Sequence, residues 1–122
     1  MGDLTKNFSK SEFECPCCKV STIDGGLVHS LQRIRDTLGR SMAITSGYRC
    51  EAHNKAVGGV ETSAHRLGLA VDIACKTSTD RARLLPLLVK EFRRIGIGKD
   101  FIHVDIDMSK PNPVIWDYYG TH

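Results

Sequence analysis

The sequence predicts an α+β fold in which helices pack on a small, mostly antiparallel sheet. Apolar residues recur at helical spacing in two long segments, and short apolar or alternating segments lie between and after them. The chain has 122 residues, of which 41% are hydrophobic, so it is long enough to bury a core. We therefore expect one domain over residues 1–122, with an N-terminal arm at residues 1–20.

The elements of the first half follow from local signals. Within residues 7–18, serines precede a glutamate and a phenylalanine, which is a helix-start pattern. Residues 24–38 carry leucine or isoleucine at helical spacing, and Gly39 follows, so an amphipathic helix should end there. Residues 42–45 are typical of a strand, and residues 50–57 of a short helix that two glycines interrupt.

The second half alternates strand and helix signals. A turn glycine leads into a strand over residues 69–75. Residues 79–95 have apolar side chains on one side and predict a second long helix, which Pro86 either kinks or begins. A strongly alternating strand follows over residues 101–107, and residues 114–118 are expected to form the last strand.

Composition and charge exclude several classes of function. Seventeen Lys+Arg against fourteen Asp+Glu give a net charge of +3, and the basic residues are scattered. Arg33, Arg35 and Arg40 fall on or directly after the first helix, where a solvated face explains them, so we expect no nucleic-acid partner. No apolar run reaches the roughly 18–20 residues that span a bilayer, so we expect no transmembrane segment.

The N-terminus lacks the apolar stretch of a signal peptide. We therefore expect cytoplasmic synthesis, or a signal that has been removed. We also expect a monomeric protein. Five cysteines cannot all pair within one chain, which favours reduced thiols.

Alternation along two predicted strands points to a metal site. Residues at odd and even positions of a strand face opposite sides, so each strand has an apolar side and a side that bears Asp72 or His103. If the strands are neighbours, these two side chains converge, and His65 can fold back over the start of its own strand. Two imidazoles and one carboxylate form an open zinc site, with the fourth position left for water.

A general base must lie within hydrogen-bond reach of that water. Asp100 is the candidate, but residues 100 and 103 of a continuous strand would face opposite ways. Asp100 must therefore lie in a turn after Gly98 that brings its carboxylate to the metal's side. Asp105 is the rival, either as base or as the group that orients an imidazole.

Four motifs that occur in order along the chain support this interpretation. They are Ser-Gly-Tyr-Arg at 46–49, His-Asn followed by Val-Gly-Gly within 53–59, Ser-x-His-x-x-Gly-x-Ala-x-Asp at 63–72, and Asp-x-x-His-Val-Asp at 100–105. This order resembles the zinc D-Ala-D-Ala carboxypeptidase family, which includes phage L-alanyl-D-glutamate endolysins and shares its fold with the hedgehog signalling domain. The resemblance covers roughly residues 8–107 and implies a hedgehog/DD-peptidase-like fold.

The resemblance also implies a role for each matching residue. His65, Asp72 and His103 would bind Zn²⁺. Asp100 would be the base and then the acid that protonates the leaving amine, although many members carry Glu there. Arg49 would hold the substrate carbonyl as its oxygen becomes negative; otherwise it is a surface arginine that ends a strand. Ser63 would bind the substrate backbone or, equally, cap the turn before His65.

The cysteines depart from this pattern. Cys15, Cys17 and Cys18 invite a second metal site, but the sequence has no second cysteine pair at zinc-finger spacing, so free thiols or one disulfide are the expectation. Cys75 falls on the apolar face of its strand, which predicts a core position. Cys50 directly follows Arg49.

These observations predict a zinc metallopeptidase that cuts the stem peptide of bacterial peptidoglycan. The short chain, without an obvious lid, favours an endopeptidase with an open groove over a D-Ala-D-Ala carboxypeptidase. A zinc-dependent binding module without catalysis and a structural zinc protein centred on the cysteines are the rivals from other classes. An enzyme of this kind would act on the wall after release, as a phage or prophage product does.

Overall fold

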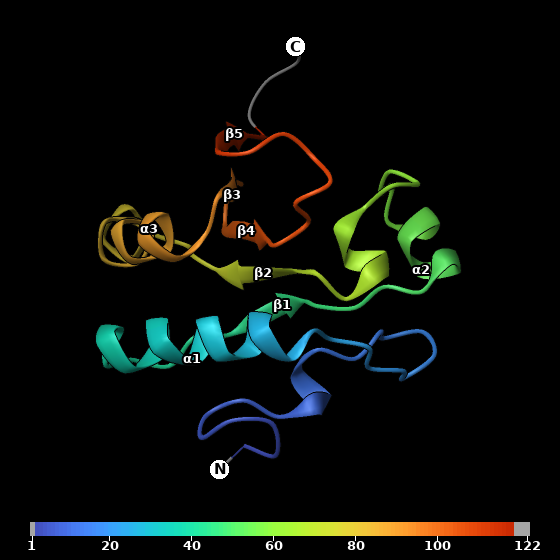
Figure 1. Ribbon diagram of the computed structural model, residues 1–122, viewed down its shortest axis with the longest axis horizontal. Helices are drawn as coiled ribbons and strands as arrows, with labels where there is room; N and C mark the ends of the chain where they lie inside the picture. Colours follow the sequence, from blue (N-terminus) through green and yellow to red (C-terminus); the bar gives the residue numbers. More distant parts are fainter. Residues whose placement is uncertain (1, 119–122) are drawn as a thin grey trace.

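The structure is a computed structural model and describes residues 2–118. Five strands form one sheet in the order β1-β2-β4-β3-β5 (Figure 1). All neighbouring strands are antiparallel except β3 and β5, which are parallel. The predicted α+β class with a mostly antiparallel sheet is therefore confirmed. The strands are β1 Ile44–Ser46, β2 Ala70–Ala74, β3 Arg94–Ile97, β4 Phe101–Asp105 and β5 Val114–Asp117.

Within residues 2–118, three α-helices and two 3₁₀ turns accompany the sheet. Helices α1 and α3 pack together, while α2 and η2 lie towards the opposite end of the molecule (Figure 1). The core forms where α1 and α3 meet the apolar face of the sheet. The elements are η1 Lys10–Glu12, α1 Gly25–Leu38, α2 Glu51–Ala56, η2 Ala64–Leu67 and α3 Ser78–Glu91.

Helix α1 confirms the first predicted helix. The Asp24 side chain accepts a hydrogen bond from the backbone N–H of Leu27 at 3.0 Å and caps the helix start. Gly39 ends the helix in the left-handed conformation, with φ of 68°. The apolar stripe, which includes Leu31 and Ile34, is buried in the core.

The second long helix is shorter than the sequence predicts. Helix α3 ends at Glu91, and the predicted residues 94 and 95 lie in β3 instead. Ile95 continues the helical spacing of the buried Leu84 and Leu88, so the pattern extends past the true end of the helix. Strand pairing overrides it, because β3 is hydrogen-bonded to β4 on one side and β5 on the other. Pro86 lies inside α3.

The other elements match with shifted ends. Strand β1 begins two residues later than predicted and reaches Ser46, with an irregular register against β2. Strand β4 stops at Asp105, because the backbone turns at Asp107, whose carboxylate accepts from Ser109. The short helix predicted at residues 50–57 is α2. The sequence did not predict η2, the 3₁₀ turn that carries His65.

The N-terminal arm is attached to the core by two aromatic residues. Phe8 and Phe13 are buried, and their rings lie 5.9 Å apart. The backbone N–H of Tyr48 donates to the carbonyl of Phe13, which links the arm to the segment after β1. The arm therefore lies beside the chain that leads into α2.

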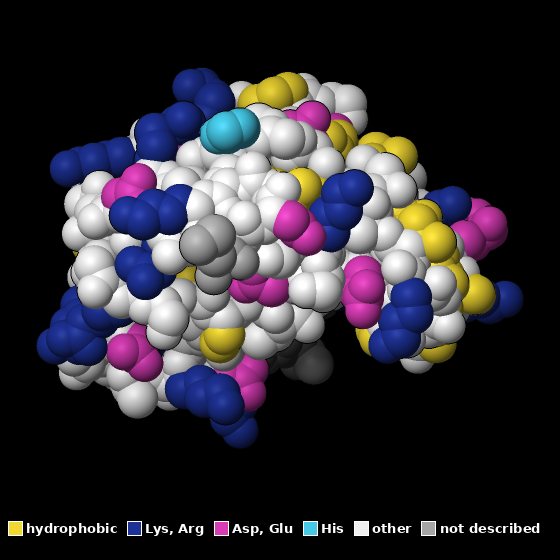
Figure 2. Space-filling view, turned by 90° about the horizontal axis from the view of Figure 1, so that it is seen from below, with side chains coloured by type: hydrophobic (Ala, Val, Ile, Leu, Met, Phe, Trp, Pro, Cys, Tyr) yellow, Lys and Arg dark blue, Asp and Glu magenta, His cyan; other side chains and the backbone are white. Residues whose placement is uncertain are grey.

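Basic and acidic side chains are interspersed on the face seen from below (Figure 2). Arg33 on α1 pairs with Glu91 of α3 at 2.9 Å. Within residues 2–118, none of the helices combines the length and the apolar character that crossing a bilayer requires.

Candidate metal centre

Strands β2 and β4 bring Asp72 and His103 face to face. The two residues are direct partners in the antiparallel register. His103 Nδ1 lies 3.0 Å from Asp72 Oδ1, and both side chains are largely buried. The apolar neighbours Val71 and Val104 point into the core on the other face. Alternation along each strand thus places the two predicted ligands together.

His65 reaches the same carboxylate from η2. Its Nε2 lies 3.3 Å from Asp72 Oδ1, and its side chain is 3% exposed. Ser63 caps the turn, because its hydroxyl oxygen accepts from the backbone N–H of His65 at 3.2 Å. Gly68 ends the turn with φ of 71°, where a Cβ atom would also collide with the carbonyl of Thr22. A tight turn therefore folds His65 back over the start of β2.

Hydrogen bonds fix which nitrogen of each imidazole faces the metal position. His65 Nδ1 lies 2.7 Å from the Gly47 carbonyl, which can only accept, so Nδ1 carries the proton and Nε2 faces Asp72. His103 Nε2 lies 2.7 Å from Asp105 Oδ2, which leaves Nδ1 facing Asp72. These are the partners that orient imidazole ligands in metal sites.

The donor set fits a zinc ion. One nitrogen from each imidazole and one oxygen of Asp72 lie within 4.8 Å of one another. Zinc bonds of roughly 2.0–2.2 Å to nitrogen and oxygen imply donors about 3.3 Å apart in a tetrahedron. The observed separations of 3.0 and 3.3 Å from Asp72 Oδ1 to the two histidines agree with this. Three protein ligands leave the fourth position open.

The charges of the cluster make a proton and a metal ion compete for the nitrogen of His103 that faces Asp72. Burial raises the pKa of Asp72, but hydrogen bonds from His103 and His65 outweigh burial and hold that pKa well below its usual range. Burial lowers the pKa of His103, but hydrogen bonds to Asp105 and Asp72 outweigh it and raise that pKa. A metal at His103 Nδ1 must therefore displace the proton shared with Asp72.

Asp105 orients His103 and is itself held from two sides. Its Oδ1 accepts from Arg94 Nε at 2.7 Å and from the backbone N–H of Asp107 at 3.1 Å, and the residue is 1% exposed. Arg94 also donates to the carbonyl of Pro111 and lies over the Trp116 ring, 5.0 Å from its centroid. Of the two roles left open for Asp105, these contacts describe the orienting one.

Arg49 lies beside the ligands and is fixed by three partners. Its guanidinium donates to Ser46 Oγ at 3.1 Å and to Asn54 Oδ1 at 3.3 Å, and it lies 3.5 Å from Asp72 Oδ2. Asn54 is buried and donates to the carbonyl of Val60 at 2.8 Å. A Cβ atom at Gly59 would collide with Asn54, so glycine is required there. Asn54 thus connects Arg49 to the loop beside the cleft.

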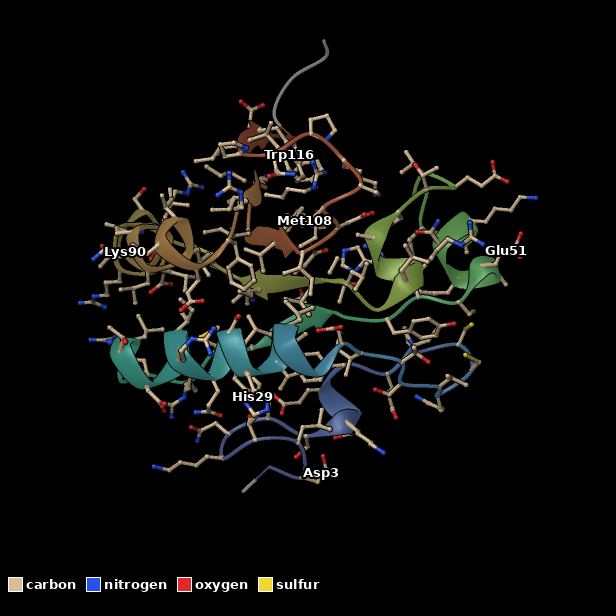
Figure 3. The ribbon with its side chains drawn as sticks, viewed as in Figure 1. Asp3, His29, Glu51, Lys90, Met108 and Trp116 are labelled. Carbon is tan, nitrogen blue, oxygen red and sulfur yellow. The ribbon has the colours of Figure 1, made fainter. Side chains whose placement is uncertain are left out.

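The ligands lie at the base of a cleft of about 410 Å³. Phe101, Trp116 and Tyr118 supply aromatic walls, and the Trp116 ring lies 5.5 Å from the His103 ring. Figure 3 labels Trp116 on β5, on the same side of the molecule as Met108. The remaining wall is the loop of residues 57–60, and Ser63 also lines the cleft. A groove of this size accommodates a short segment of extended peptide.

The structure does not bring Asp100 to the metal ligands. A tight turn joins β3 to β4 at residues 98–101, as predicted, with the N–H of Gly98 donating to the carbonyl of Phe101. Asp100 is exposed in this turn and its carbonyl accepts from the backbone of Cys75. Among the described residues that line the cleft, the carboxylates are Asp72 and Asp105.

Four residues of the site had no role predicted from the sequence: Arg94, Asn54, Trp116 and Tyr118. Arg94 fell inside a predicted helix, so no signal placed it on a strand beside Asp105. Trp116 and Tyr118 alternate along the last predicted strand, and this period-two pattern could have placed both on one face. Asn54 belongs to the His-Asn motif, but the motif predicts no role for it, because that role depends on how α2 meets Arg49.

Three side chains that could hold one metal ion lie beside a fixed arginine in an α+β cleft, and this arrangement is typical of metallohydrolases. The chain matches the Peptidase M15 family over residues 6–105 and belongs to that family. M15 peptidases are zinc-dependent, so the chain is a metallopeptidase with a candidate zinc site at His65, Asp72 and His103. No curated protein matches the sequence.

Proposed function

We propose that the protein is a zinc endopeptidase that hydrolyses a peptide bond in the stem peptide of bacterial peptidoglycan. The observation that carries this proposal is the convergence of His65, Asp72 and His103 beside Arg49 at the base of an open cleft. The family match supports the peptidase class. The resemblance of residues 46–49, 63–72 and 100–105 to wall-cleaving enzymes supports the substrate.

The three ligands would hold the zinc ion, which when bound supplies a Lewis acid and lowers the pKa of a coordinated water. The residues around it have separate tasks. Arg49 is a fixed cation that can hold the oxygen of the scissile carbonyl as it becomes negative. Ser63 uses its oxygen to cap η2, and its hydroxyl proton can still donate to a substrate carbonyl.

Proton transfer is assigned to Asp100 in this proposal. Asp100 would take a proton from the attacking water and then deliver it to the leaving nitrogen. Its place three residues before His103 and the sequence resemblance support the role. The turn of residues 98–101 must then swing the carboxylate from solvent into the cleft. Asp105 is the competing carboxylate, although both of its oxygens already accept hydrogen bonds.

The charges of the cleft favour internal cleavage over release of a terminal residue. A carboxypeptidase needs a cation for the free carboxylate of its substrate. Among the described lining residues the cations are Arg49, Arg94 and Lys110; each pairs with an aspartate, and the scissile carbonyl would occupy Arg49 in this proposal. The three pairs are Arg49–Asp72 at 3.5 Å, Arg94–Asp105 at 2.7 Å and Lys110–Asp107 at 3.1 Å.

Digestion of purified peptidoglycan by the zinc-loaded protein tests this function. Mass spectrometry of the soluble products should show stem peptides cut at an internal bond. Release of free D-Ala would instead identify a D-Ala-D-Ala carboxypeptidase. A protein that binds zinc and the wall without turnover would be a binding module, and this would overturn the proposal.

Variants of two histidines make the result specific. His65→Ala should abolish turnover together with the zinc of the cleft, because it removes one of three ligands. His29→Ala is the matched control, since His29 is exposed on α1 and should leave both quantities unchanged.

A further inference from the structure

Four of the five cysteines converge at one place outside the cleft. Cys15, Cys17 and Cys18 come from the arm, and Cys50 precedes α2. The four sulfur atoms all lie within 4.8 Å of one another. In Figure 3 sulfur atoms (yellow) are seen where the loop of the arm lies next to α2, near the labelled Glu51. The fifth, Cys75, is buried in the core, as predicted.

The spacing of the sulfur atoms fits a tetrahedral metal site. Zinc–sulfur bonds of about 2.3 Å place the thiolates of a four-cysteine site about 3.8 Å apart. The Sγ atom of Cys15 lies 3.5 Å from that of Cys17 and 3.6 Å from that of Cys50. The Sγ atoms of Cys17 and Cys50 are 3.1 Å apart. A disulfide would require about 2.05 Å and would join only one pair.

The backbone around the cysteines forms a ligand loop. The N–H of Cys15 donates to the carbonyl of Val20, and the N–H of Lys19 donates back to the carbonyl of Cys15, both at 2.8 Å. Lys19 turns the chain with φ of 61°. Hydrogen bonds therefore close the loop around Cys17 and Cys18 without any cross-link.

The opposite side of the cluster is equally ordered. Cys50 caps α2, with its sulfur accepting from the backbone N–H of His53 at 3.5 Å. Cys15 is fully buried, whereas Cys17 and Cys18 are exposed, so an ion can reach the cluster from solvent.

We propose that Cys15, Cys17, Cys18 and Cys50 form a second, structural zinc site. Four thiols would bind one Zn²⁺ and release their protons to solvent. Four protein ligands leave no open position, so this site is closed and non-catalytic. The ion would connect the N-terminal arm to the start of α2.

The site also bears on the cleft, and this part rests on the proposed function. Cys50 directly follows Arg49, and the backbone N–H of Arg49 donates to the carbonyl of His65 at 3.1 Å. A metal that fixes Cys50 would therefore limit the movement of Arg49. Arg49 would be positioned from three directions: the metal-bound Cys50, Asn54 and the turn of His65.

Zinc content of purified variants tests the second site. The full chain should hold two zinc ions, one for each donor group. Cys17→Ser and Cys18→Ser should each lower the content to one and leave the cleft zinc bound, while His65→Ala should lose the other ion. Both cysteines are exposed, so these variants should fold. Cys75→Ala is the control and should retain both ions.

Two further measurements distinguish thiolate binding from other outcomes. Cobalt(II) bound to wild-type protein and to His65→Ala should show the intense charge-transfer absorption of a tetrahedral thiolate centre, and Cys17→Ser should lose it. Thiol titration of the denatured, chelated and unreduced protein should find five thiols. Three thiols would reveal a disulfide and overturn the proposal.

The zinc counts separate this proposal from the proposed function. One ion that His65→Ala removes and Cys17→Ser retains would overturn the cysteine site and keep the cleft site. One ion that Cys17→Ser removes and His65→Ala retains would overturn the cleft site and keep the cysteine site.

Discussion

The two clusters of candidate metal ligands differ in what holds their side chains together. The cleft ligands lie on paired strands and a capped turn, and the second nitrogen of each imidazole has its own hydrogen-bond partner. The cysteines lie on a surface loop and a helix start, two segments that local backbone bonds shape separately. The cleft is therefore preorganised by the fold, whereas the cysteine cluster depends more on the metal itself.

The clusters also differ in their surroundings, and this difference distinguishes a candidate catalytic metal site from a candidate structural one. Arg49 and the aromatic side chains of Trp116 and Tyr118 line the same cleft as the candidate ligands. Four thiols in the other cluster would fill every position of a tetrahedral ion. Substitution of a residue that acts on the substrate, and neither ligates nor orients a ligand, should thus lower turnover while the zinc content stays unchanged.

Asp100→Asn is expected to have the largest effect of this kind. A general base contributes about 10²–10⁴-fold, so turnover of peptidoglycan should fall by that factor while the zinc content stays unchanged. Asp36→Asn is the matched control, because Asp36 is an exposed carboxylate on α1. Steady-state rates and metal analysis of both variants provide the measurement.

Unchanged turnover in Asp100→Asn would remove Asp100 from the mechanism. The structure makes this a sharp test, because the carboxylate lies in a turn outside the cleft. The remaining carboxylate of the cleft that does not ligate the metal is, among the described residues, Asp105.

Arg49→Lys should have the next largest effect. Lysine keeps the charge but cannot reproduce the planar guanidinium that contacts Ser46, Asn54 and Asp72 together. Loss of one fixed donor to a developing oxyanion costs about 10²–10³-fold in kcat. Zinc content should be unchanged, and KM should change less than kcat. The control is Arg35→Lys on α1.

A large loss of zinc in Arg49→Lys would contradict this prediction. It would mean that Arg49 holds Asp72 in place for the metal and does not act on the substrate.

Local patterns in the sequence were enough to predict that Asp72 and His103 lie side by side, while their role as metal ligands stays a prediction. Asp72 and His103 follow from alternation in two strands whose apolar faces are unmistakable, and their pairing follows once the strands are neighbours. The turn at residues 98–101 was predicted as well. The turn was also expected to bring the carboxylate of Asp100 to the metal's side, but Asp100 is exposed and does not line the cleft, because a tight turn can direct its side chains to either face.

Features that depend on long-range packing could not be predicted in this way. Cys50 lies 35 residues from Cys15, and only the contact between the arm and the segment after β1 brings them together. Ile95 continued a helical pattern, so Arg94 was placed on a helix instead of on β3, where it pairs with Asp105. Neither contact can be inferred from the spacing of these residues along the chain.

Asp105→Asn should have the smallest effect and should act through the metal. Asp105 contacts His103 and Arg94. Its effect would come through the orientation of His103, so it is a positioning residue. Loss of such a partner weakens metal affinity about 10–100-fold. Zinc affinity, measured by competition with a chelator, should fall by that factor, and excess zinc should restore most of the turnover.

Asp107→Asn is the control for this prediction, because it removes a carboxylate two residues away that bonds to Ser109 and Lys110 and does not contact His103. Its zinc affinity should stay close to that of the wild type. Turnover of Asp105→Asn that stays low at saturating zinc would show that Asp105 takes part in proton transfer. The base would then lie within the preorganised hydrogen-bond network of the cleft, and the turn of residues 98–101 would have no catalytic role.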